Sequence, residues 1–211
     1  MRSSPTSPAS SSGDTAAPYI DDTVRWLERA VIGLNLCPFA KSVHAKGLIH
    51  YTVVDAREPQ GVLLALRSEL ESLAACSPDE RDTTLLVLPH CLESFLDFND
   101  FLGDADQLLE SMDLDGVLQI ASFHPHFQFA GTSADDVTNC TNRSPYPTLH
   151  LLREESVDRA VAAFPEAETI YERNIEVLES LGASGWAALE VGAHDLPRGC
   201  SSSRKADGES Q

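Results

Sequence analysis

Three short apolar segments alternate with two amphipathic segments in the middle of this chain. The apolar segments are typical of strands, and hydrophobic residues recur at helical spacing in the segments between them. Strands that alternate with helices usually form a parallel sheet, because each helix carries the chain back to the same edge. The predicted strands are 48–55, 83–88 and 116–123, and the predicted helices are 60–76 and 92–111.

The flanking segments extend this pattern. Residues 21–34 have one apolar stripe at helical spacing, and residues 148–153 alternate in the way that suits an edge strand. Two further helices are predicted at 156–163 and 166–181. The elements together predict an α/β fold, a small and mostly parallel sheet of three to four strands with helices packed on it.

The two ends of the chain differ from the middle in composition. Residues 1–20 are rich in Ser, Pro and Ala, and residues 197–211 are similarly poor in large apolar groups. Such segments bury too little apolar surface to offset the entropy of ordering, so both are predicted to be disordered tails. A single globular domain is expected at residues 21–196.

The formal net charge of −18 bears on partners. Nucleic acid and anionic membrane surfaces require a basic face, so neither is expected as a partner. No apolar run approaches the length of about 20 residues that spans a bilayer, and the N-terminus lacks the apolar segment of a secretory signal. We expect a soluble, cytoplasmic protein with reduced cysteines, although Arg2 among several serines weakly suggests organellar import.

A cysteine follows the first predicted helix, at a junction where Pro38 interrupts the helical pattern. If Cys37 lies where the next helix starts, free backbone N–H groups would favour its thiolate, and Lys41 would add positive charge. Cys37 is therefore a candidate nucleophile. The alternative is that Cys37 is an ordinary core residue, since cysteine is among the residues most often buried.

The longest irregular stretch of the chain follows the third predicted strand and begins at His124. Ligands of α/β proteins usually bind at the carboxyl ends of strands, and a long loop in a compact domain is usually functional or disordered. Aromatic residues within it could anchor this loop, so an ordered functional loop is expected. Its other polar candidates are His126, Asp135, Asp136, Asn139, Cys140, Asn142 and Arg143.

Four interpretations of this loop remain open. His124 and His126 could bind a transition metal together with Asp135, Asp136 or Cys140, although the spacing matches no standard zinc pattern. Cys37 could attack a substrate with His124 as base, while Asn139 or Asn142 orients the imidazole or holds an oxyanion. Arg143, with Asn142 and His124, could bind an anionic ligand without catalysis. The polar residues could also simply form turns, with His124 a hydrogen-bonded core residue.

Several longer motifs carry a resemblance. The segments AVIGLNLCPFAK (30–41), DTTLLVLP (82–89), FLDFNDFL (95–102), QIASFHP with QFAGT (119–132) and NCTNRSPYPTLHLLRE (139–154) resemble the bacterial and protist family described as domain of unknown function 1415. The resemblance covers residues 22–190 and implies no reaction. It directs attention to Asn35, Cys37, Pro38, His124, Pro125, Asn139, Asn142, Arg143, Pro145 and His150. The family commonly has an acidic or variable residue in place of His126, which weakens the paired-histidine metal site.

The sequence therefore predicts an enzyme that acts on a small, anionic metabolite, with a transition metal as a further candidate cofactor. The candidate catalytic residues are Cys37, His124, Asn139 and Asn142. The candidate substrate-binding residues are Arg143, Asn35 and His150, and the candidate metal ligands are His124, His126 and Cys37. The alternative is a non-catalytic protein that binds a small molecule or another protein.

Overall fold

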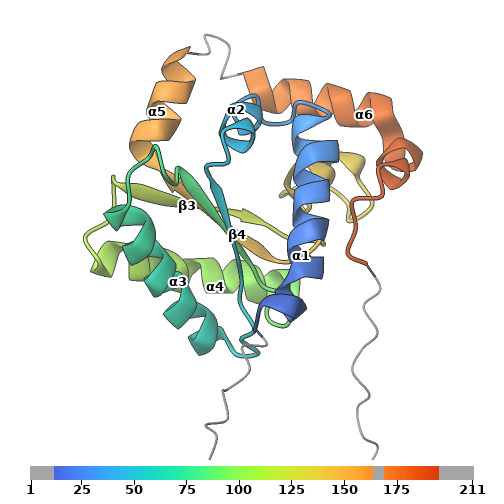
Figure 1. Cartoon of the computed structure of the whole chain (residues 1–211). Coiled ribbons are helices and arrows are strands. Elements are labelled where there is room, and N and C mark those ends of the chain that lie inside the picture. Colours follow the sequence, from blue (N-terminus) through green and yellow to red (C-terminus); the bar gives the residue numbers. More distant parts are fainter. Residues whose placement is uncertain (1–11, 164–168, 195–211) are drawn as a thin grey trace, which may run out of the picture.

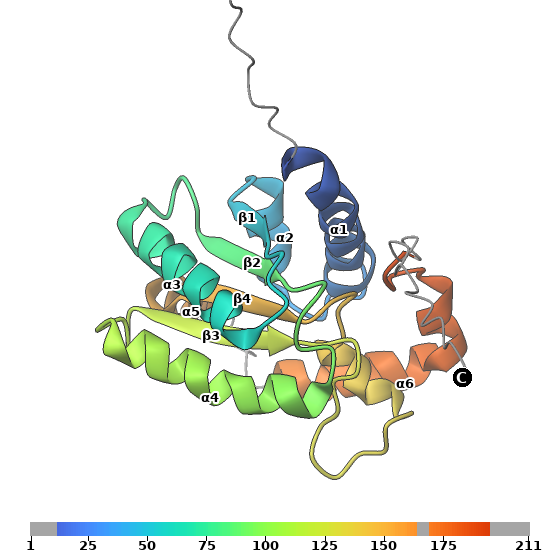
Figure 2. The same cartoon turned by 90° about the horizontal axis from the view of Figure 1, so that it is seen from below.

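The computed structural model describes residues 12–163 and 169–194. It confirms the α/β class: a four-stranded sheet lies between two layers of helices (Figures 1 and 2). The strands are β1 (Ile49–Val53), β2 (Thr83–Val87), β3 (Leu118–Phe123) and β4 (Thr148–Arg153). The helices are α1 (Ser12–Trp26), the π-helix η1 (Leu27–Ile32), α2 (Ala40–Ala45), α3 (Pro59–Ala75), α4 (Phe95–Ser111), the 3-10 helix η2 (Val137–Asn142), α5 (Glu154–Ala163) and α6 (Ile170–Ala188).

The strand order is β1-β2-β4-β3. Strands β1, β2 and β3 point the same way, as the alternation predicts, but β4 runs antiparallel between β2 and β3. Within the described sheet, β1 and β2 are therefore the one parallel pair of neighbours, and the sheet is mixed. The predicted edge position of 148–153 is wrong. Its alternation has another cause, because Leu149 and Leu151 enter the main core while His150, between them, faces the opposite helical layer.

Helices α3 and α4 cover one face of the sheet and enclose the main core. Residue pairs at helical spacing on these helices pack against the inward residues of β2, β3 and β4. This burial removes the apolar face of each helix from water, which is the dominant favourable contribution to folding. The fully buried members of this cluster include Val62, Leu66, Leu70, Leu73, Leu86, Leu88, Phe98, Ala105, Leu149 and Leu151.

Helices α1, η1, α2 and α6 lie on the other face (Figure 2). Side chains of one cross-strand row share a face, so Tyr51, Leu85 and His150 point together towards these helices. Ile49, Tyr51 and Phe123 pack against a second cluster, whose buried members are Trp26, Leu27, Ala30, Val31 and Val191. This face is covered less completely than the first, since Tyr51, Phe123 and His150 are all partly accessible.

The first helix begins earlier than the sequence predicts. Ser12–Ile20 form its first turns, whereas the composition predicts a disordered tail there. Tertiary contacts explain the difference, because the ring of Tyr19 packs edge-on against the rings of Tyr146 and His90. The remaining parts of both predicted tails lie outside the described residues. None of the helices in the described ranges is long and apolar enough to cross a bilayer.

Candidate functional site

His124 follows β3, as predicted, and its side chain is completely buried. Its Nδ1 accepts a hydrogen bond from the backbone N–H of His126 (3.0 Å), so the proton is on Nε2, which donates to the carbonyl of Leu92 (3.1 Å). Burial lowers the pKa of His124 and keeps the ring neutral. Both ring nitrogens are therefore used within the protein. Leu92 has a φ of 59°, so His124 also holds a strained backbone position.

Asn139 and Arg143 hold the loop that follows His124. The Oδ1 atom of the buried Asn139 accepts from the backbone N–H of Phe129 (2.9 Å), and its Nδ2 donates to the carbonyl of Ser133 (2.8 Å). Arg143 donates from Nε to the carbonyl of Phe127 (3.2 Å) and from an Nη to the carbonyl of Ala134 (2.6 Å). These bonds close the loop on itself. They are the contacts that the turn interpretation of this stretch expects.

The remaining polar residues of the loop are also engaged locally. The backbone carbonyl of Asn142 accepts from the N–H of His124 (3.1 Å). Asp136 accepts from the hydroxyl (2.7 Å) and the backbone N–H (2.9 Å) of Thr138 at the start of η2, and these two bonds lower the pKa of its carboxyl. Asp135 accepts from the hydroxyl of Ser133 (2.6 Å).

The described residues do not assemble a metal site from these candidates. No group of three or more His, Cys, Asp or Glu side chains within them has a geometry that could hold an ion. Burial raises the pKa of the Cys140 thiol, although the nearby Arg143 opposes the shift, and a metal ligand must be a thiolate. The rings of His124 and His126 contact each other, with centroids 5.8 Å apart, but Cys37 is not brought to them. The ring of His124 packs between Phe95 and Phe98 of α4, on the opposite face of the sheet from the cluster that Cys37 joins.

Cys37 lies in the junction between η1 and α2, on the α1 face of the sheet. Its thiol is half-buried and packs against the cluster that also receives Tyr51 and Phe123. The ring of Phe123 in turn contacts the ring of His150, with centroids 6.1 Å apart. Two sequence-predicted residues, Cys37 and His150, therefore share one face of the sheet, whereas His124, Asn139 and Arg143 build the loop beside it.

The imidazole of His150 has a defined tautomer. The hydroxyl proton of Thr83 goes to the carbonyl of Leu151 (2.6 Å), so the contact of 2.6 Å between the Thr83 oxygen and Nε2 of His150 requires the proton to be on Nε2. Its Nδ1 consequently carries a lone pair. Burial lowers the pKa of His150 to about 4, which keeps the ring neutral at physiological pH.

The hydroxyl of Tyr51 is buried and has no hydrogen-bond partner. Burial and the nearby carboxylate of Glu28 raise the pKa of Tyr51 to about 12, so the hydroxyl keeps its proton and is a donor. Tyr51 and His150 occupy one cross-strand row with Leu85 between them. Neighbouring strands are about 4.8 Å apart, so the backbones at Tyr51 and His150 are about 10 Å apart.

Helix α6 holds the Cys37 junction from the other side. Arg173 donates to the carbonyl of Asn35, whose φ of 54° lies in the left-handed region. Nδ2 of Asn174 donates to the carbonyl of Leu36 (2.9 Å), which belongs to the peptide bond that joins Leu36 to Cys37. Asn174 is only 4% exposed, and its Oδ1 has no hydrogen-bond partner. A buried acceptor without a donor therefore lies against the peptide bond of the thiol residue.

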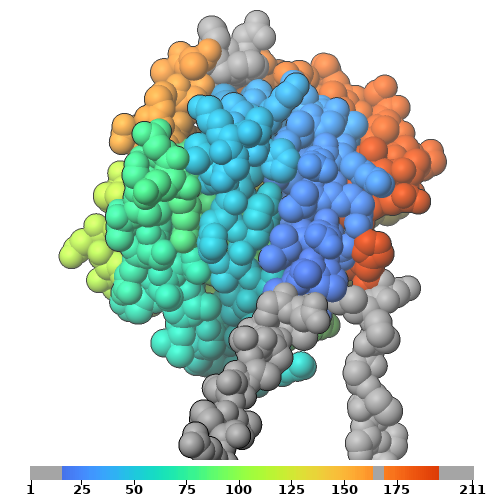
Figure 3. Space-filling model, in the orientation of Figure 1, coloured from blue at the N-terminus to red at the C-terminus, as the bar shows by residue number. Residues whose placement is uncertain are grey.

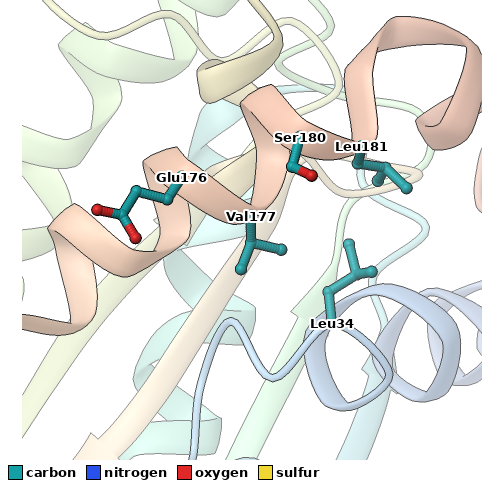
Figure 4. A pocket seen from close by; sticks show the side chains of 5 residues that line it. All are labelled: Leu34, Glu176, Val177, Ser180 and Leu181. Carbon is teal, nitrogen blue, oxygen red and sulfur yellow. The ribbon is translucent and has the colours of Figure 1, made fainter.

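A hollow of about 430 Å³ adjoins this junction. Figure 4 shows the side chain of Leu34 pointing across it towards Val177 and Leu181 of α6. Val177 and Leu181 follow Asn174 at spacings of three and seven residues, so all three lie on one side of the helix. The hollow thus lies on the same side of α6 as Asn174, although Asn174 itself does not line it.

A second hollow, of about 590 Å³, lies at the carboxyl end of β2 beside His90. The hydroxyl of Tyr19 is 3.3 Å from Nε2 of His90, and Asp55 is 3.6 Å from the same atom. The carboxylates that line this hollow are on solvent-exposed parts of the loop and of α4, namely Glu93, Asp97, Asp100 and Asp104. It has no unpaired buried polar group of the kind found beside Cys37.

The buried carboxylate of Asp22 fastens the C-terminal segment to α1. It accepts from the hydroxyl of Tyr146 (2.6 Å), from Arg25 (2.7 Å) and from the backbone N–H of His194 (2.8 Å). Burial alone would raise the pKa of Asp22, but these hydrogen bonds outweigh burial and leave the pKa below its usual value. Every oxygen is satisfied, so this cluster is structural.

Sequence reasoning missed Tyr51 and Asn174. Tyrosine is an ordinary strand residue, and nothing in the sequence indicates that its hydroxyl is unpaired. The sequence gives a weak indication that Asn174 is buried, because it lies in the apolar stripe of its helix with Val177, Leu178 and Leu181. A polar residue at such a position must find a partner across the core.

The comparisons with known proteins give one match. The family model described as Protein of unknown function (DUF1415) matches residues 18–188. No curated protein and no solved structure matched the chain.

Proposed function

The chain belongs to the DUF1415 family, and because that membership names no reaction, we propose from its own residues that it is an enzyme acting on a small molecule through the thiol of Cys37. The site is the face of the sheet beneath η1, α2 and α6. It differs from the one expected from the sequence in two respects. His150 takes the place of His124, whose two nitrogens are hydrogen bonded to backbone. Tyr51 and Asn174 take the place of the loop residues Asn139 and Arg143, which bond the loop's own backbone.

The observation that carries the proposal is the pair of unpaired buried polar atoms. Among the described residues, the buried side-chain nitrogen and oxygen atoms without a partner are the Tyr51 hydroxyl and Oδ1 of Asn174. Asn174 lies against the Leu36–Cys37 peptide bond, and Tyr51 packs against the same cluster as Cys37. An unpaired buried group costs stability, so its presence calls for an explanation, and groups that serve a substrate provide one.

The three groups have complementary chemistry. Cys37 supplies a thiol, whose sulfur becomes a strong nucleophile when it loses its proton. His150 supplies a lone pair on Nδ1 that can receive a proton, and its low pKa favours passing that proton on to a leaving group. Tyr51 retains its proton and can donate a hydrogen bond to an oxygen that becomes negative during the reaction.

The loop after His124 has a supporting part in this proposal. His124, Asn139 and Arg143 close the loop by bonds to its backbone, and the loop contains η2, which packs against α6. Helix α6 in turn carries Asn174. The loop therefore positions the wall of the site rather than contacting the substrate.

A non-catalytic binding protein is the alternative class. It would use the same unpaired groups to hold a ligand but would not need a reactive thiol. Labelling kinetics separate the two classes, because only a thiolate reacts readily with alkylating reagents. Cys76 is a reference for exposure, since its thiol is also half-buried, and its sulfur contacts the Arg153 guanidinium at 3.4 Å. All proteins would carry Cys200→Ser, because Cys200 lies outside the described residues.

The test is the rate of alkylation of Cys37 and Cys76 by iodoacetamide between pH 6 and pH 9, measured by peptide mass spectrometry. We expect Cys37 to react about tenfold faster than Cys76 at neutral pH. His150→Gln keeps a donor for Thr83 but cannot accept a proton, so it should slow Cys37 and leave Cys76 unchanged. His50→Gln, at an exposed histidine on β1, is the control. Equal rates at the two thiols, with ligand-induced thermal stabilisation alone, would favour the binding protein.

A further inference from the structure

The segment that follows α6 returns to the first helix of the chain. Residues 189–194, which we call the C-terminal strap, lie beside α1 and η1, and Figure 3 shows the orange-red atoms of this end against the blue atoms of the helix. Arg25 donates from Nε and Nη2 to two carbonyls of the strap, at 2.8 and 3.2 Å, and Arg29 donates to a third at 3.0 Å. These bonds reach the main chain of the strap, so they fix its path whatever its side chains are.

The far end of the strap is fastened at Asp22. This carboxylate accepts from the backbone N–H of His194 (2.8 Å) and also pairs with Arg25 (2.7 Å), which it orients towards the strap. The side chain of Asp22 is completely buried, whereas the ring of His194 is mostly exposed. Asp22, Arg25 and Arg29 thus form one stripe of polar groups along α1 and η1 that holds the strap.

One apolar side chain anchors the strap to the core. Val191 is only 5% exposed, Leu189 is partly buried, and the other residues of the strap are exposed. Val191 belongs to a cluster whose other buried members are Trp26, Leu27, Ala30 and Val31. A segment with few buried apolar contacts belongs to the least stable part of a fold and opens locally more easily than the core.

Two backbone features favour movement of the strap as a unit. Glu190 has a φ of 53°, in the left-handed region, which costs free energy in a residue with a side chain. Gly182 has a φ of 67° and a ψ of 172°, so it interrupts the helical geometry of α6. Leu178, before this interruption, packs in a different cluster with Cys140. Opening of the strap therefore relieves strain at Glu190 and leaves the first part of α6 in place.

We infer that the C-terminal strap opens while the rest of the chain stays folded, and that its position controls access to the thiol of Cys37. The connection is the cluster that contains Val191, because the half-buried Cys37 packs against the same cluster. When Val191 leaves this cluster, the apolar stripe of α1 and η1 becomes accessible and Cys37 loses part of its cover. The control of access rests on the proposed function of Cys37, whereas the opening of the strap does not.

Hydrogen exchange in dilute urea tests the opening itself on the full chain. The amide of His194 is bonded to Asp22, so its exchange reports release of the strap. We expect this exchange to be nearly independent of urea below the unfolding transition, because local opening exposes little surface. The amides of β2, whose residues are all buried, should exchange more slowly and with a steep dependence on urea. Equal rates and equal urea dependence at His194 and in β2 would overturn the inference, because the strap would then open only on global unfolding.

Two variants of the strap should act in opposite directions. Val191→Ala removes two buried carbon atoms, so exchange of the His194 amide should become about tenfold faster, and alkylation of Cys37 by iodoacetamide should become faster with it. Glu190→Asn should slow both processes, because asparagine adopts the left-handed conformation more readily. Val161→Ala, at a valine of α5 that is 45% exposed, is the matched control and should change neither.

The outcomes separate this inference from the proposed function. If the strap variants change the exchange at His194 but not the alkylation rate of Cys37, control of access is overturned, and the thiol enzyme stands as long as Cys37 still reacts faster than Cys76. If Cys37 reacts no faster than Cys76 in any variant, the proposed function fails and the control of access fails with it.

Discussion

Replacement of Tyr51 by Phe should make the protein more stable. The Tyr51 hydroxyl is buried without a partner, so folding removes it from water and returns no hydrogen bond. Leaving a buried polar group unsatisfied costs about 1–3 kcal/mol, and deletion of that group recovers this cost. The ring itself packs against the cluster around Trp26, and phenylalanine keeps that packing. We expect a gain of about 1–2 kcal/mol in the free energy of unfolding.

Two other tyrosines serve as comparisons: substitution by phenylalanine should reduce the free energy of unfolding at one of them and leave it nearly unchanged at the other. Tyr146 donates to the buried carboxylate of Asp22 (2.6 Å), so Tyr146→Phe should cost about 1.5–3 kcal/mol, the range for hydrogen bonds to charged groups. Tyr171 is exposed, and Tyr171→Phe should change stability by less than about 0.5 kcal/mol. The three variants remove the same hydroxyl from three environments, so differences between them report the environment alone.

Urea unfolding followed by circular dichroism measures these differences, with stability obtained by linear extrapolation. Thermal unfolding is a second readout, in which 1 kcal/mol corresponds to a shift of about 2–4 °C for a chain of this size. A loss of stability of 1 kcal/mol or more in Tyr51→Phe would refute the reasoning, because it would mean that the hydroxyl makes a favourable bond in the folded protein. The Cys37 proposal would then lose one of its two unpaired groups.

Three further predictions follow from the contacts around the site. The free energy of unfolding should fall by at most about 3 kcal/mol as the pH drops from about 6.5 to about 4. The reason is that His150 has a pKa of about 4 in the folded state, while a histidine in the unfolded chain binds a proton near pH 6.5. His150→Gln should flatten this slope in urea titrations at several pH values, and an unchanged slope would contradict the assignment. His124→Leu should lower the free energy of unfolding by about 3 kcal/mol, because it leaves the Leu92 carbonyl and the His126 N–H unpaired. His126→Ala removes an exposed side chain and should be nearly neutral. Equal effects of the two variants in urea unfolding would argue against the His124 bonds. Arg143→Gln should speed limited proteolysis between Phe127 and Ala134, since the guanidinium donates to both carbonyls, and cleavage at the wild-type rate would show that these bonds do not hold the loop.

The sequence predicted the strands and helices well where local patterns decide them. The apolar run at Thr83–Val87 and the stripes of α3 and α4 correspond to buried elements of the sheet and its helical cover. The position of β4 was predicted wrongly, because the alternation of Thr148–Arg153 reflects two different buried environments rather than one face in water. Periodicity shows which residues share a face but does not show what covers that face.

The candidate site was predictable only in part. The sequence directed attention to Cys37 through its junction and to His150 through a family resemblance, and the structure places both on one face of the sheet. Asp136 makes the local contact that the turn interpretation expects, with a partner two residues away, whereas Asn139 bonds residues six and ten positions away. The unpaired groups were out of reach, because the contact between Asn174 and Leu36 joins residues 138 positions apart, and no local pattern encodes such a contact.

The central claim is that Cys37 is the reactive group of a site. The most direct measurement is to treat the folded wild-type chain at neutral pH with less than one equivalent of iodoacetamide and to locate the label by peptide mass spectrometry. The account predicts that, among Cys37, Cys76, Cys91 and Cys140, most of the label is on Cys37, although Cys76 is also half-buried. A label divided evenly between Cys37 and Cys76 would contradict it, because exposure alone would then explain the reactivity.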